Sequence, residues 1–273
     1  MAEKLINTIP QMGYGTWNRS PEEAYQGVLW ALEAGCRHID TAQGYQNEEA
    51  VGRAIKDSGI PRDEIHITTK IAPENFAPGE PTRTALESLE KLGVDQVDLL
   101  LLHWPAIKNQ YPMPSYAGEL AALYDGGKAR MIGISNFTIP LVDEIISVLG
   151  DRPIATNQCE MHVYFQNRKV AAHCAEKGIP MTAYSPLARG AVKDDPVLTE
   201  IGARYGATDA QIALAFLMHE GHIVIPSSGK KERIIANFEA RKIELNDDDV
   251  ARIRGLDKHM RLVNGDWCPV WDD

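Results

Sequence analysis

The chain has 273 residues, of which 44% are hydrophobic and 24% are charged, and its formal net charge is -10 at pH 7. These proportions are typical of a soluble globular protein and exclude a disordered or fibrous chain. The acidic balance argues against a nucleic-acid partner, and the absence of an apolar leader or a run of about 18 apolar residues argues against a membrane partner.

The four cysteines indicate a reducing environment. They are Cys36, Cys159, Cys174 and Cys268. They form no CxxC pair and are too few and too scattered for a disulfide framework in a chain of this length. We therefore expect free thiols in a cytoplasmic protein, and no feature of the sequence calls for an obligate protein partner.

The first predicted helix begins at a capping box. In Ser20-Pro-Glu-Glu23 a serine precedes a glutamate by three positions, and proline occupies the first helical position. Gly35 ends this helix, because glycine readily takes the left-handed conformation found at helix ends. Residues 36–40 then read as a buried strand, and the same unit repeats along the chain.

The repeat of helix, glycine and strand continues to the last quarter of the chain. Asn47 begins the second helix, Thr208-Asp-Ala-Gln211 is another capping box, and a last helix begins near Asn246. Counting the first segment, the predicted strands are 12–15, 36–40, 64–70, 97–103, 129–135, 154–160, 179–184 and 222–226. Eight strands separated by helices predict parallel crossovers and an α/β fold, the (β/α)8 TIM barrel, as a single domain over residues 1–273. An open doubly wound sheet is the alternative.

Polar side chains collect at the C-terminal ends of the predicted strands. They are Asp40, Lys70, His103, Ser135, Asn136, Gln158, Tyr184, Ser227 and Ser228. In a barrel these ends share one face, which is where barrel enzymes hold their active sites. Each of these residues alone more often has a structural role. The prediction of an active site therefore rests on their common location at the strand ends.

Three of these residues, Asp40, Lys70 and His103, have a joint chemical logic with Tyr45. Tyr45 follows Asp40 by five residues, and a phenol of ordinary pKa is a poor proton donor at neutral pH. An ammonium at Lys70 would lower that pKa, with Asp40 holding Lys70 charged. His103 can donate a hydrogen bond to an oxygen that becomes negative. This combination suits the reduction of a carbonyl group.

Motifs across nearly the whole chain resemble the aldo-keto reductase family in order and spacing. They are Gly13-Tyr-Gly-Thr-Trp17, His38-Ile-Asp-Thr-Ala-Gln-Gly-Tyr-Gln-Asn-Glu48, Thr69-Lys70, Leu102-His-Trp-Pro105, Gly133-Ile-Ser-Asn-Phe137, Asn157-Gln158, Ala183-Tyr-Ser-Pro-Leu187 and Ile225-Pro-Ser-Ser228. Within the family the chain is most similar to bacterial 2,5-diketo-D-gluconate reductases, also described as methylglyoxal reductases. The resemblance implies NADPH-dependent reduction of aldehydes and ketones to alcohols, on small dicarbonyl or keto-sugar-acid substrates.

The resemblance also implies a role for each site residue. It makes Tyr45 the general acid, Lys70 and Asp40 its tuning pair, and His103 the residue that orients the substrate carbonyl. Tyr184 is expected to stack on the nicotinamide ring. The other positions implied in cofactor binding are Gly15, Thr16, Ser135, Asn136, Gln158, Ser185, Leu187, Arg189, Gly190, Ser227, Ser228, Gly229, Lys230, Arg233 and Asn237.

The choice of cofactor depends on a basic cluster near the C-terminal end of the barrel. Lys230, Lys231 and Arg233 form a cationic group in an acidic chain, which favours the 2'-phosphate of NADPH. Two positions depart from the family's pattern, because many members have lysine at Ser227 and a glutamate at Ala236. NADH is therefore a possible second cofactor.

The substrate pocket and the rival functions complete the hypotheses. Trp17, Trp104 and the tail from Arg261 to Trp271, including Trp267, are candidates for the pocket wall, with the loop 105–115 over it. One rival is a metal-dependent hydrolase whose candidate ligands are His38, Asp40, His103 and His162. The other is a catalytically silent nucleotide-binding barrel, since the same fold serves many functions. The metal hypothesis leaves Tyr45 and Lys70 without a role, so we expect no metal site.

Overall fold

A closed barrel of eight parallel strands forms the centre of the computed structural model, which describes residues 4–272. The strands are β3 (Tyr14–Gly15), β4 (His38–Asp40), β5 (His66–Ile71), β6 (Val97–Leu102), β7 (Ala129–Ser135), β8 (Ile154–Glu160), β9 (Met181–Tyr184) and β10 (Ile223–Val224). Each pairs in parallel with its neighbour in the chain. A parallel bridge between Met12 and Val224 closes the ring, so the predicted (β/α)8 barrel is confirmed and the open sheet was wrong.

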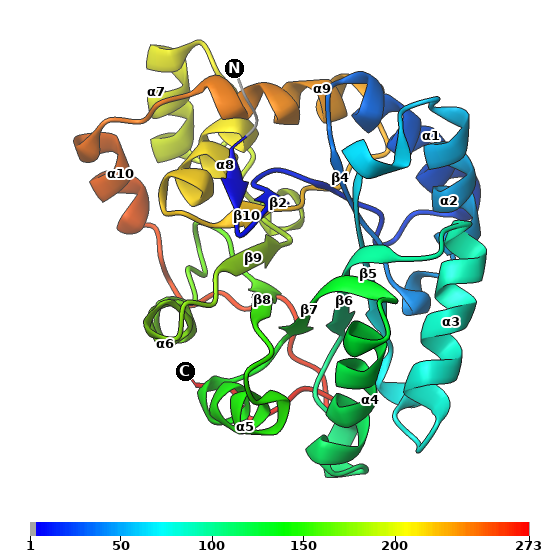
Figure 1. Ribbon diagram of the computed structural model, residues 1–273. Helices are drawn as coiled ribbons and strands as arrows, with labels where there is room; N and C mark the ends of the chain where they lie inside the picture. Colours follow the sequence, from blue (N-terminus) through cyan, green and yellow to red (C-terminus); the bar gives the residue numbers. More distant parts are fainter. Residues whose placement is uncertain (1–3, 273) are drawn as a thin grey trace.

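Helices surround the strands on the outside (Figure 1). Those that connect successive strands are α1 (Pro21–Glu33), α2 (Glu48–Asp57), α3 (Glu80–Leu92), α4 (Met113–Asp125), α5 (Ile139–Leu149), α6 (Arg168–Glu176) and α8 (Asp209–His219), with α9 (Lys231–Glu239) after β10. Both predicted capping boxes, Ser20 with Glu23 and Thr208 with Gln211, are present. The last predicted helix is α10 (Asp247–Arg254), capped by Asn246. The sequence reading did not identify α7 (Pro196–Tyr205), which Asp195 caps.

A short N-terminal hairpin was also missed. Its strands β1 (Leu5–Ile6) and β2 (Ile9–Pro10) pair antiparallel across one end of the barrel (Figure 1). Ile9 is fully buried and packs in the interior of the barrel with Leu99, Leu101, Ala155 and Ile223. Because burial of one such side chain stabilises the fold by roughly 1.5–3 kcal/mol, the hairpin closes the N-terminal end of the barrel as part of the core.

Helix α2 packs unusually close to α3, and this contact fixes the helix that follows the Tyr45 loop. A Cβ atom at Gly52 would stand 2.4 Å from the carbonyl oxygen of Leu92, so only glycine permits this separation. Val51 and Ala54 on the same helix are fully buried. The amphipathic pattern of α2 thus turns its apolar side inward and holds the preceding loop at the end of β4.

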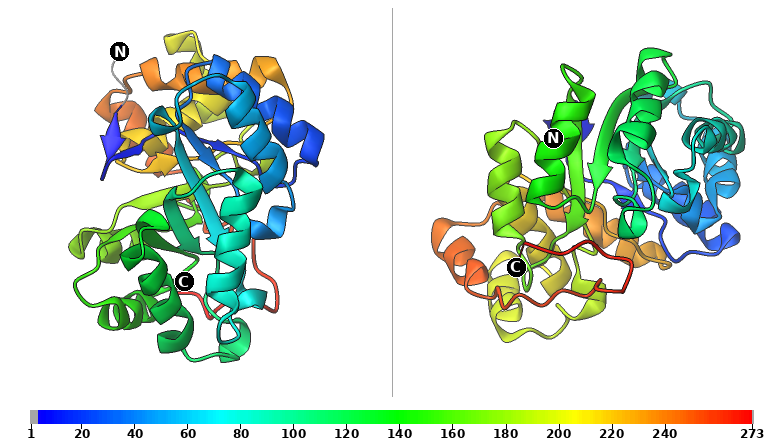
Figure 2. Two further views of the ribbon diagram at one scale, coloured as in Figure 1. Left: turned by 45° about the vertical axis from the view of Figure 1, so that its right-hand side comes forward. Right: turned by 90° about the horizontal axis from the view of Figure 1, so that it is seen from below.

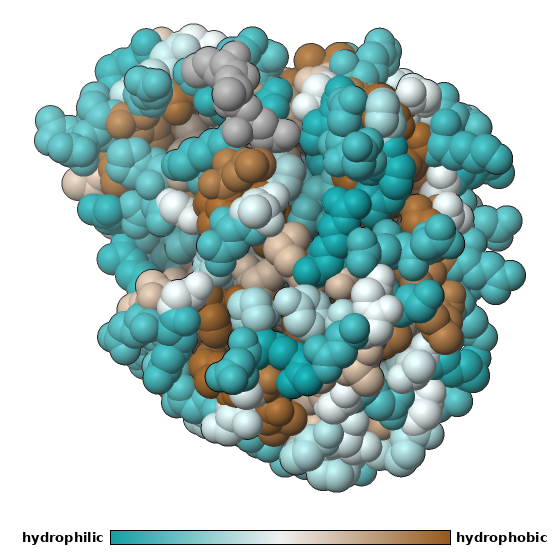
Figure 3. All heavy atoms as spheres, viewed as in Figure 1, coloured by the Kyte–Doolittle hydropathy of each residue, from teal (hydrophilic) through white to brown (hydrophobic). Residues whose placement is uncertain are grey.

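The C-terminal tail leaves α10 and crosses the molecule as an irregular segment (red in Figure 2). It is tied down at several points, among them a hydrogen bond of 2.9 Å from the backbone N–H of Ile139 to Asp272. Figure 3 shows a mostly hydrophilic outer surface on the hairpin side, with small separate hydrophobic areas. Among residues 4–272, no helix is long and apolar enough to cross a membrane.

Candidate active site

Lys70 is the centre of a buried polar cluster at the C-terminal ends of the strands. Its side chain is fully buried, and its Nζ donates to Asp40 Oδ1 at 2.5 Å, to the carbonyl oxygen of Thr41 at 2.7 Å and to the Tyr45 hydroxyl oxygen at 3.4 Å. Burial is the largest influence and acts to lower the pKa of Lys70, but Asp40 and Tyr45 together outweigh it and raise that pKa above its ordinary value. Lys70 is therefore an ammonium with three acceptors.

Tyr45 lies in a short 3₁₀ turn, Gln43–Tyr45, between β4 and α2. Burial raises the pKa of its phenol, while the adjacent Lys70 ammonium acts to lower it. Lys70 thus acts in the predicted direction, but the net shift of the pKa is upward because burial outweighs the charge of Lys70. The phenol thus keeps its proton, and the ammonium reduces the cost of losing it.

His103 follows β6 and faces the same space as Tyr45. Their ring centroids are 5.6 Å apart in an edge-to-face arrangement. Burial, with a smaller contribution from the Lys70 ammonium, holds the pKa of His103 well below its usual value, so its imidazole is neutral near pH 7. No hydrogen bond to its ring nitrogens occurs within the described residues 4–272, which leaves a neutral imidazole available to a carbonyl oxygen.

A second set of polar side chains joins this cluster from β7, β8 and β9. Gln158 Nε2 donates to Asp40 Oδ2 at 2.7 Å, and the Ser135 hydroxyl donates to the carbonyl oxygen of Gln158 at 2.8 Å. Asn136 Nδ2 donates to the carbonyl oxygen of His103 at 3.0 Å, and the Tyr184 hydroxyl donates to Asn136 Oδ1 at 2.8 Å. The network holds the Tyr184 hydroxyl and the backbone of His103 in place beside the Asp40 cluster.

Asn47 organises the loops on the other side of the cluster. The sequence reading gave it the start of α2, but its side chain makes no capping hydrogen bond. Instead its Nδ2 donates to the carbonyl oxygens of Thr16 and Arg19, and its Oδ1 accepts from the Thr41 hydroxyl at 3.0 Å. Asn47 therefore joins the loop after β3 to the loop after β4. An asparagine before a helix is so common as a cap that no local signal separates the two roles.

The loop Ser185–Gly190 has an unusual backbone conformation. Ser185, Ala188 and Arg189 have positive φ angles of 49°, 47° and 52°, and Gly190 has 96°. Such conformations are rare for residues other than glycine. They fold the loop tightly, with the N–H groups of Ala188 and Gly190 donating to the carbonyl oxygens of Ser185 and Leu187 at 2.8 Å each. The guanidinium of Arg189, within this loop, lies 5.0 Å from the centroid of the Trp17 ring, so the loop's cation stands over the segment that follows β3.

The predicted adenosine segment follows β10 and begins α9. Asn237 is buried in α9, whereas Lys230 and Arg233 lie on the exposed side of the segment. Lys231, the third cation of the predicted cluster, is paired with Glu33 at 2.7 Å. The Ser227 hydroxyl oxygen is buried without a hydrogen-bond partner, which is unusual for a buried polar atom. Thr16, Gly15 and Ser228 border the same region, since Gly15 N–H donates to the carbonyl oxygen of Pro226 at 3.1 Å.

The tryptophans proposed for the substrate pocket have different surroundings. Trp104 contacts Trp271 of the tail, with ring centroids 6.1 Å apart, and the Arg261 guanidinium lies 3.9 Å from the Trp271 ring centroid. Trp267 folds over Gly265 and keeps 49% of its surface exposed. Trp271 ends the tail segment 261–271 that was predicted to line the pocket, and the tail brings it beside Trp104.

The metal-site hypothesis finds no support in the geometry. His38 contacts the carbonyl oxygen of Pro10 and the Thr68 hydroxyl, while His162 pairs with Glu160 at 3.0 Å. In the described part of the chain, no three histidine, cysteine or carboxylate side chains are grouped to hold a metal ion.

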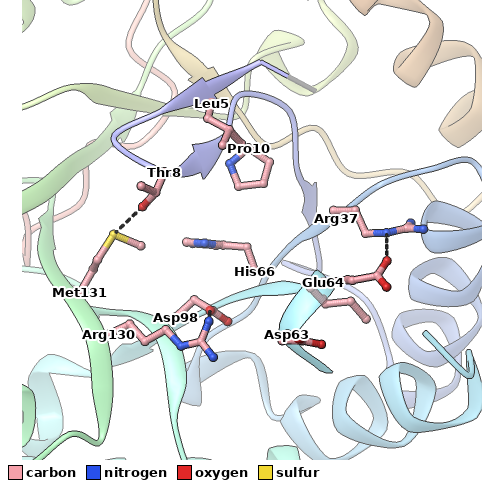
Figure 4. Close-up of a pocket in the computed structure, with 11 residues that line it drawn as sticks. Leu5, Thr8, Pro10, Arg37, Asp63, Glu64, His66, Asp98, Arg130 and Met131 are labelled. Carbon is pink, nitrogen blue, oxygen red and sulfur yellow. Dashed lines mark hydrogen bonds and ion pairs between the residues drawn. The ribbon is translucent and has the colours of Figure 1, made fainter. Parts of the chain in front are cut away.

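A cavity of about 400 Å³ lies at the opposite, N-terminal end of the strands. Figure 4 shows His66 pointing into it beneath the hairpin residues Thr8 and Pro10, with Arg130 and Asp98 along one side. The cavity includes none of the candidate site residues. The residues predicted to carry the chemistry lie near the C-terminal ends of the strands, away from this cavity.

The chain was compared with known proteins. The model of the family described as "Aldo/keto reductase family" matches residues 11–258. Methylglyoxal reductase DkgB of Escherichia coli O157:H7 is 44% identical over 265 residues, covering 97% of this chain and 99% of that relative. An aldo-keto reductase of Mycolicibacterium smegmatis is 40% identical, covering 94% of this chain and 92% of that relative.

Solved structures of similar proteins have the same fold as this chain. A crystal structure provisionally assigned as a 2,5-diketo-D-gluconic acid reductase B superposes with a TM-score of 0.94 at 39% identity, covering 98% of this chain and 95% of that chain. The aldose reductase of Schistosoma japonicum gives a TM-score of 0.89 at 30% identity, covering 93% of this chain and 91% of that chain. The similarity thus extends over the whole barrel.

Proposed function

The chain belongs to the aldo/keto reductase family and is an oxidoreductase that acts on carbonyl groups, and we propose that it reduces small dicarbonyl or keto-sugar-acid compounds with NADPH. Methylglyoxal and 2,5-diketo-D-gluconate are the first candidates, because relatives across nearly the full length are named for them. The observation that carries the proposed site is the buried contact of Lys70 with both Asp40 and Tyr45.

Residues in three segments of the chain suit the different parts of the cofactor. The backbone of Ser185–Gly190 suits a pyrophosphate, and the unpartnered Ser227 hydroxyl suits a phosphate or ribose oxygen at the adenosine end. Tyr184 presents an aromatic ring held by Asn136, which suits stacking against a nicotinamide. When bound, the reduced nicotinamide supplies the hydride.

Proton delivery falls to Tyr45. As the carbonyl oxygen gains negative charge, the O–H bond of Tyr45 breaks and its proton moves to that oxygen. The phenolate left on Tyr45 is stabilised by the Lys70 ammonium 3.4 Å away, and Asp40 keeps Lys70 charged. Neutral His103 donates a hydrogen bond that orients the substrate carbonyl, because its ring faces the same space as Tyr45.

The proposed substrates and cofactor are tested by one assay panel. The purified protein is mixed with NADPH or NADH and with methylglyoxal, 2,5-diketo-D-gluconate, a keto ester or an aromatic aldehyde, and kcat/KM is measured for each pair. We expect the dicarbonyl and keto-sugar-acid substrates to give the highest kcat/KM, with NADPH favoured. Equal kcat/KM with both cofactors would refute the NADPH preference. Cofactor binding without oxidation by any carbonyl would instead favour a silent nucleotide-binding barrel.

A further inference from the structure

Arg19 lies in the loop between β3 and α1, far along the chain from the predicted adenosine segment. Its guanidinium nevertheless contacts that segment, because a Cβ atom built on Gly229 would stand 2.9 Å from Arg19 Nη1. The absence of a side chain at Gly229 is what gives the arginine this position. Asn47 holds the loop there by donating to the carbonyl oxygen of Arg19 at 3.1 Å.

The Arg19 guanidinium lies near the Glu23 carboxylate and acts to lower the pKa of that group, but no protein atom accepts a hydrogen bond from it among the described residues 4–272. Its Nε is buried without a hydrogen-bond acceptor, and no ion pair or hydrogen bond of its side chain occurs within residues 4–272. The nearby Glu23 carboxylate accepts the backbone N–H of Ser20 at 2.9 Å in the capping box of α1. A buried guanidinium nitrogen without an acceptor indicates a ligand that supplies one.

Two contacts place the loop after β3 along the expected path of the cofactor. Trp17 lies under Arg189 of the pyrophosphate loop, and Arg19 lies against Gly229 of the adenosine segment. The neighbouring Ser227 hydroxyl is also buried without a partner, so two unpartnered polar atoms belong to this end. Of the predicted cations, Lys231 is already neutralised by Glu33.

We propose that Arg19 binds the 2'-phosphate of NADPH and is a residue that determines cofactor specificity. The inference rests on the proposed use of NADPH. A guanidinium is the side chain best suited to a phosphate, because its N–H groups match two phosphate oxygens at once. Arg19 thereby supplies a cation beside Ser227, where this chain lacks a lysine.

The test is direct titration of NADPH and NADH into the unaltered protein and into Arg19→Met, by calorimetry or by cofactor fluorescence. We expect Arg19→Met to weaken NADPH about 10- to 100-fold, as for the loss of a charged hydrogen bond, and to leave NADH within about twofold. Arg53→Met is the matched control, because Arg53 is half-exposed and pairs only weakly with Glu22 at 3.7 Å. It removes the same charge and should leave both affinities unchanged.

A second variant tests the contact itself. Gly229→Ala introduces a Cβ where Arg19 Nη1 lies, so it should displace the arginine and weaken NADPH, with little further loss in Gly229→Ala combined with Arg19→Met. Equal weakening of NADPH and NADH by Arg19→Met, or no change in either, would overturn the assignment of Arg19 alone. If the unaltered protein bound neither cofactor, the proposed function would fail, and this inference with it.

Discussion

At the scale of single residues, Lys70 is the side chain whose burial most needs explanation. A fully buried ammonium is stable only because Asp40, Thr41 and Tyr45 all accept from it. Asp40 is the only ionised partner among these, and its second oxygen is occupied by Gln158. The pair Asp40–Lys70 therefore makes the fold sensitive to the loss of either charge, and it is also proposed to adjust the pKa of Tyr45.

Asp40→Asn should destabilise the protein by about 3–5 kcal/mol, because it leaves a buried ammonium without its counter-charge. Asp40→Asn combined with Lys70→Met should recover much of that loss without recovering activity. The free energy of unfolding is measured by urea denaturation. Arg83→Met, which removes an exposed ion pair with Glu80, serves as the control and should change little. Full stability of Asp40→Asn would refute the argument.

The pH dependence of kcat/KM follows from the protonation states of His103 and Tyr45. Burial lowers the pKa of His103 and raises that of Tyr45 above 10.0, so the active form with neutral imidazole and protonated phenol persists through neutral pH. The profile of kcat/KM should be flat there and fall only above about pH 10, as Tyr45 loses its proton. A decline that already begins in the neutral range would contradict the raised pKa.

The sequence was enough to predict which residues form the site. It was not enough to predict properties that depend on contacts between distant parts of the chain. The joint arrival of Asp40, Lys70 and Tyr45 followed from counting strand ends. The direction of the Tyr45 pKa shift was not predictable, because burial is a property of the assembled site. Arg19 was missed for the same reason, since only the fold brings it to Gly229.

At the scale of elements, the C-terminal tail is held by a carboxylate at the end of β8. Glu160 is fully buried and accepts the backbone N–H groups of Leu262 at 2.6 Å and Val263 at 2.8 Å. The tail beyond these residues carries Trp271 to its contact with Trp104. Glu160 therefore positions the proposed pocket wall through the tail, and it also lies opposite Tyr184 of the site in the sheet.

Glu160→Gln should loosen the tail, because its amide nitrogen cannot accept a backbone N–H. We expect KM for the carbonyl substrate to rise severalfold, NADPH affinity to stay unchanged, and limited proteolysis to cleave the tail faster. Glu200→Gln, on the exposed side of α7, is the control. An unchanged KM with an intact tail would show that the anchor is dispensable.

The order of the elements was predictable because the starts and ends of helices are marked by short sequence signals. The boxes at Ser20 and Thr208, and Gly93 with φ of 67° at the end of α3, act within a few residues. The hairpin β1–β2 escaped prediction because strands of two residues leave no periodicity, and it is stable only as part of the core around Ile9.

At the scale of the whole molecule, buried neutral histidines couple stability to pH. Burial lowers the pKa of His38 and His66, and lowers that of His222 to about 4 from 6.5. A lowered pKa in the folded state means that the unfolded chain binds more protons, so stability is complete above about pH 6.5 and falls below it. These histidines lie on β4, on β5 and before β10, so their effect is spread over the barrel.

We propose that the barrel unfolds as one domain, with a single transition whose Tm falls between about pH 7 and about pH 5. His222→Gln should reduce this fall, because it removes the titrating group whose pKa is lowered to about 4. Calorimetry across this pH range measures both the number of transitions and the Tm. Two separate transitions, or a Tm that rises on acidification, would contradict the account.

The central claim is that Tyr45 delivers the proton, and single-turnover reduction tests it most directly. The unaltered protein and Tyr45→Phe are each loaded with NADPH and mixed with methylglyoxal, and the loss of reduced nicotinamide is followed in one turnover. Tyr45→Phe should reduce the rate by about 10²–10⁴, the usual contribution of a general acid, while NADPH affinity remains unchanged. A single-turnover rate equal to that of the unaltered protein would show that another group donates the proton.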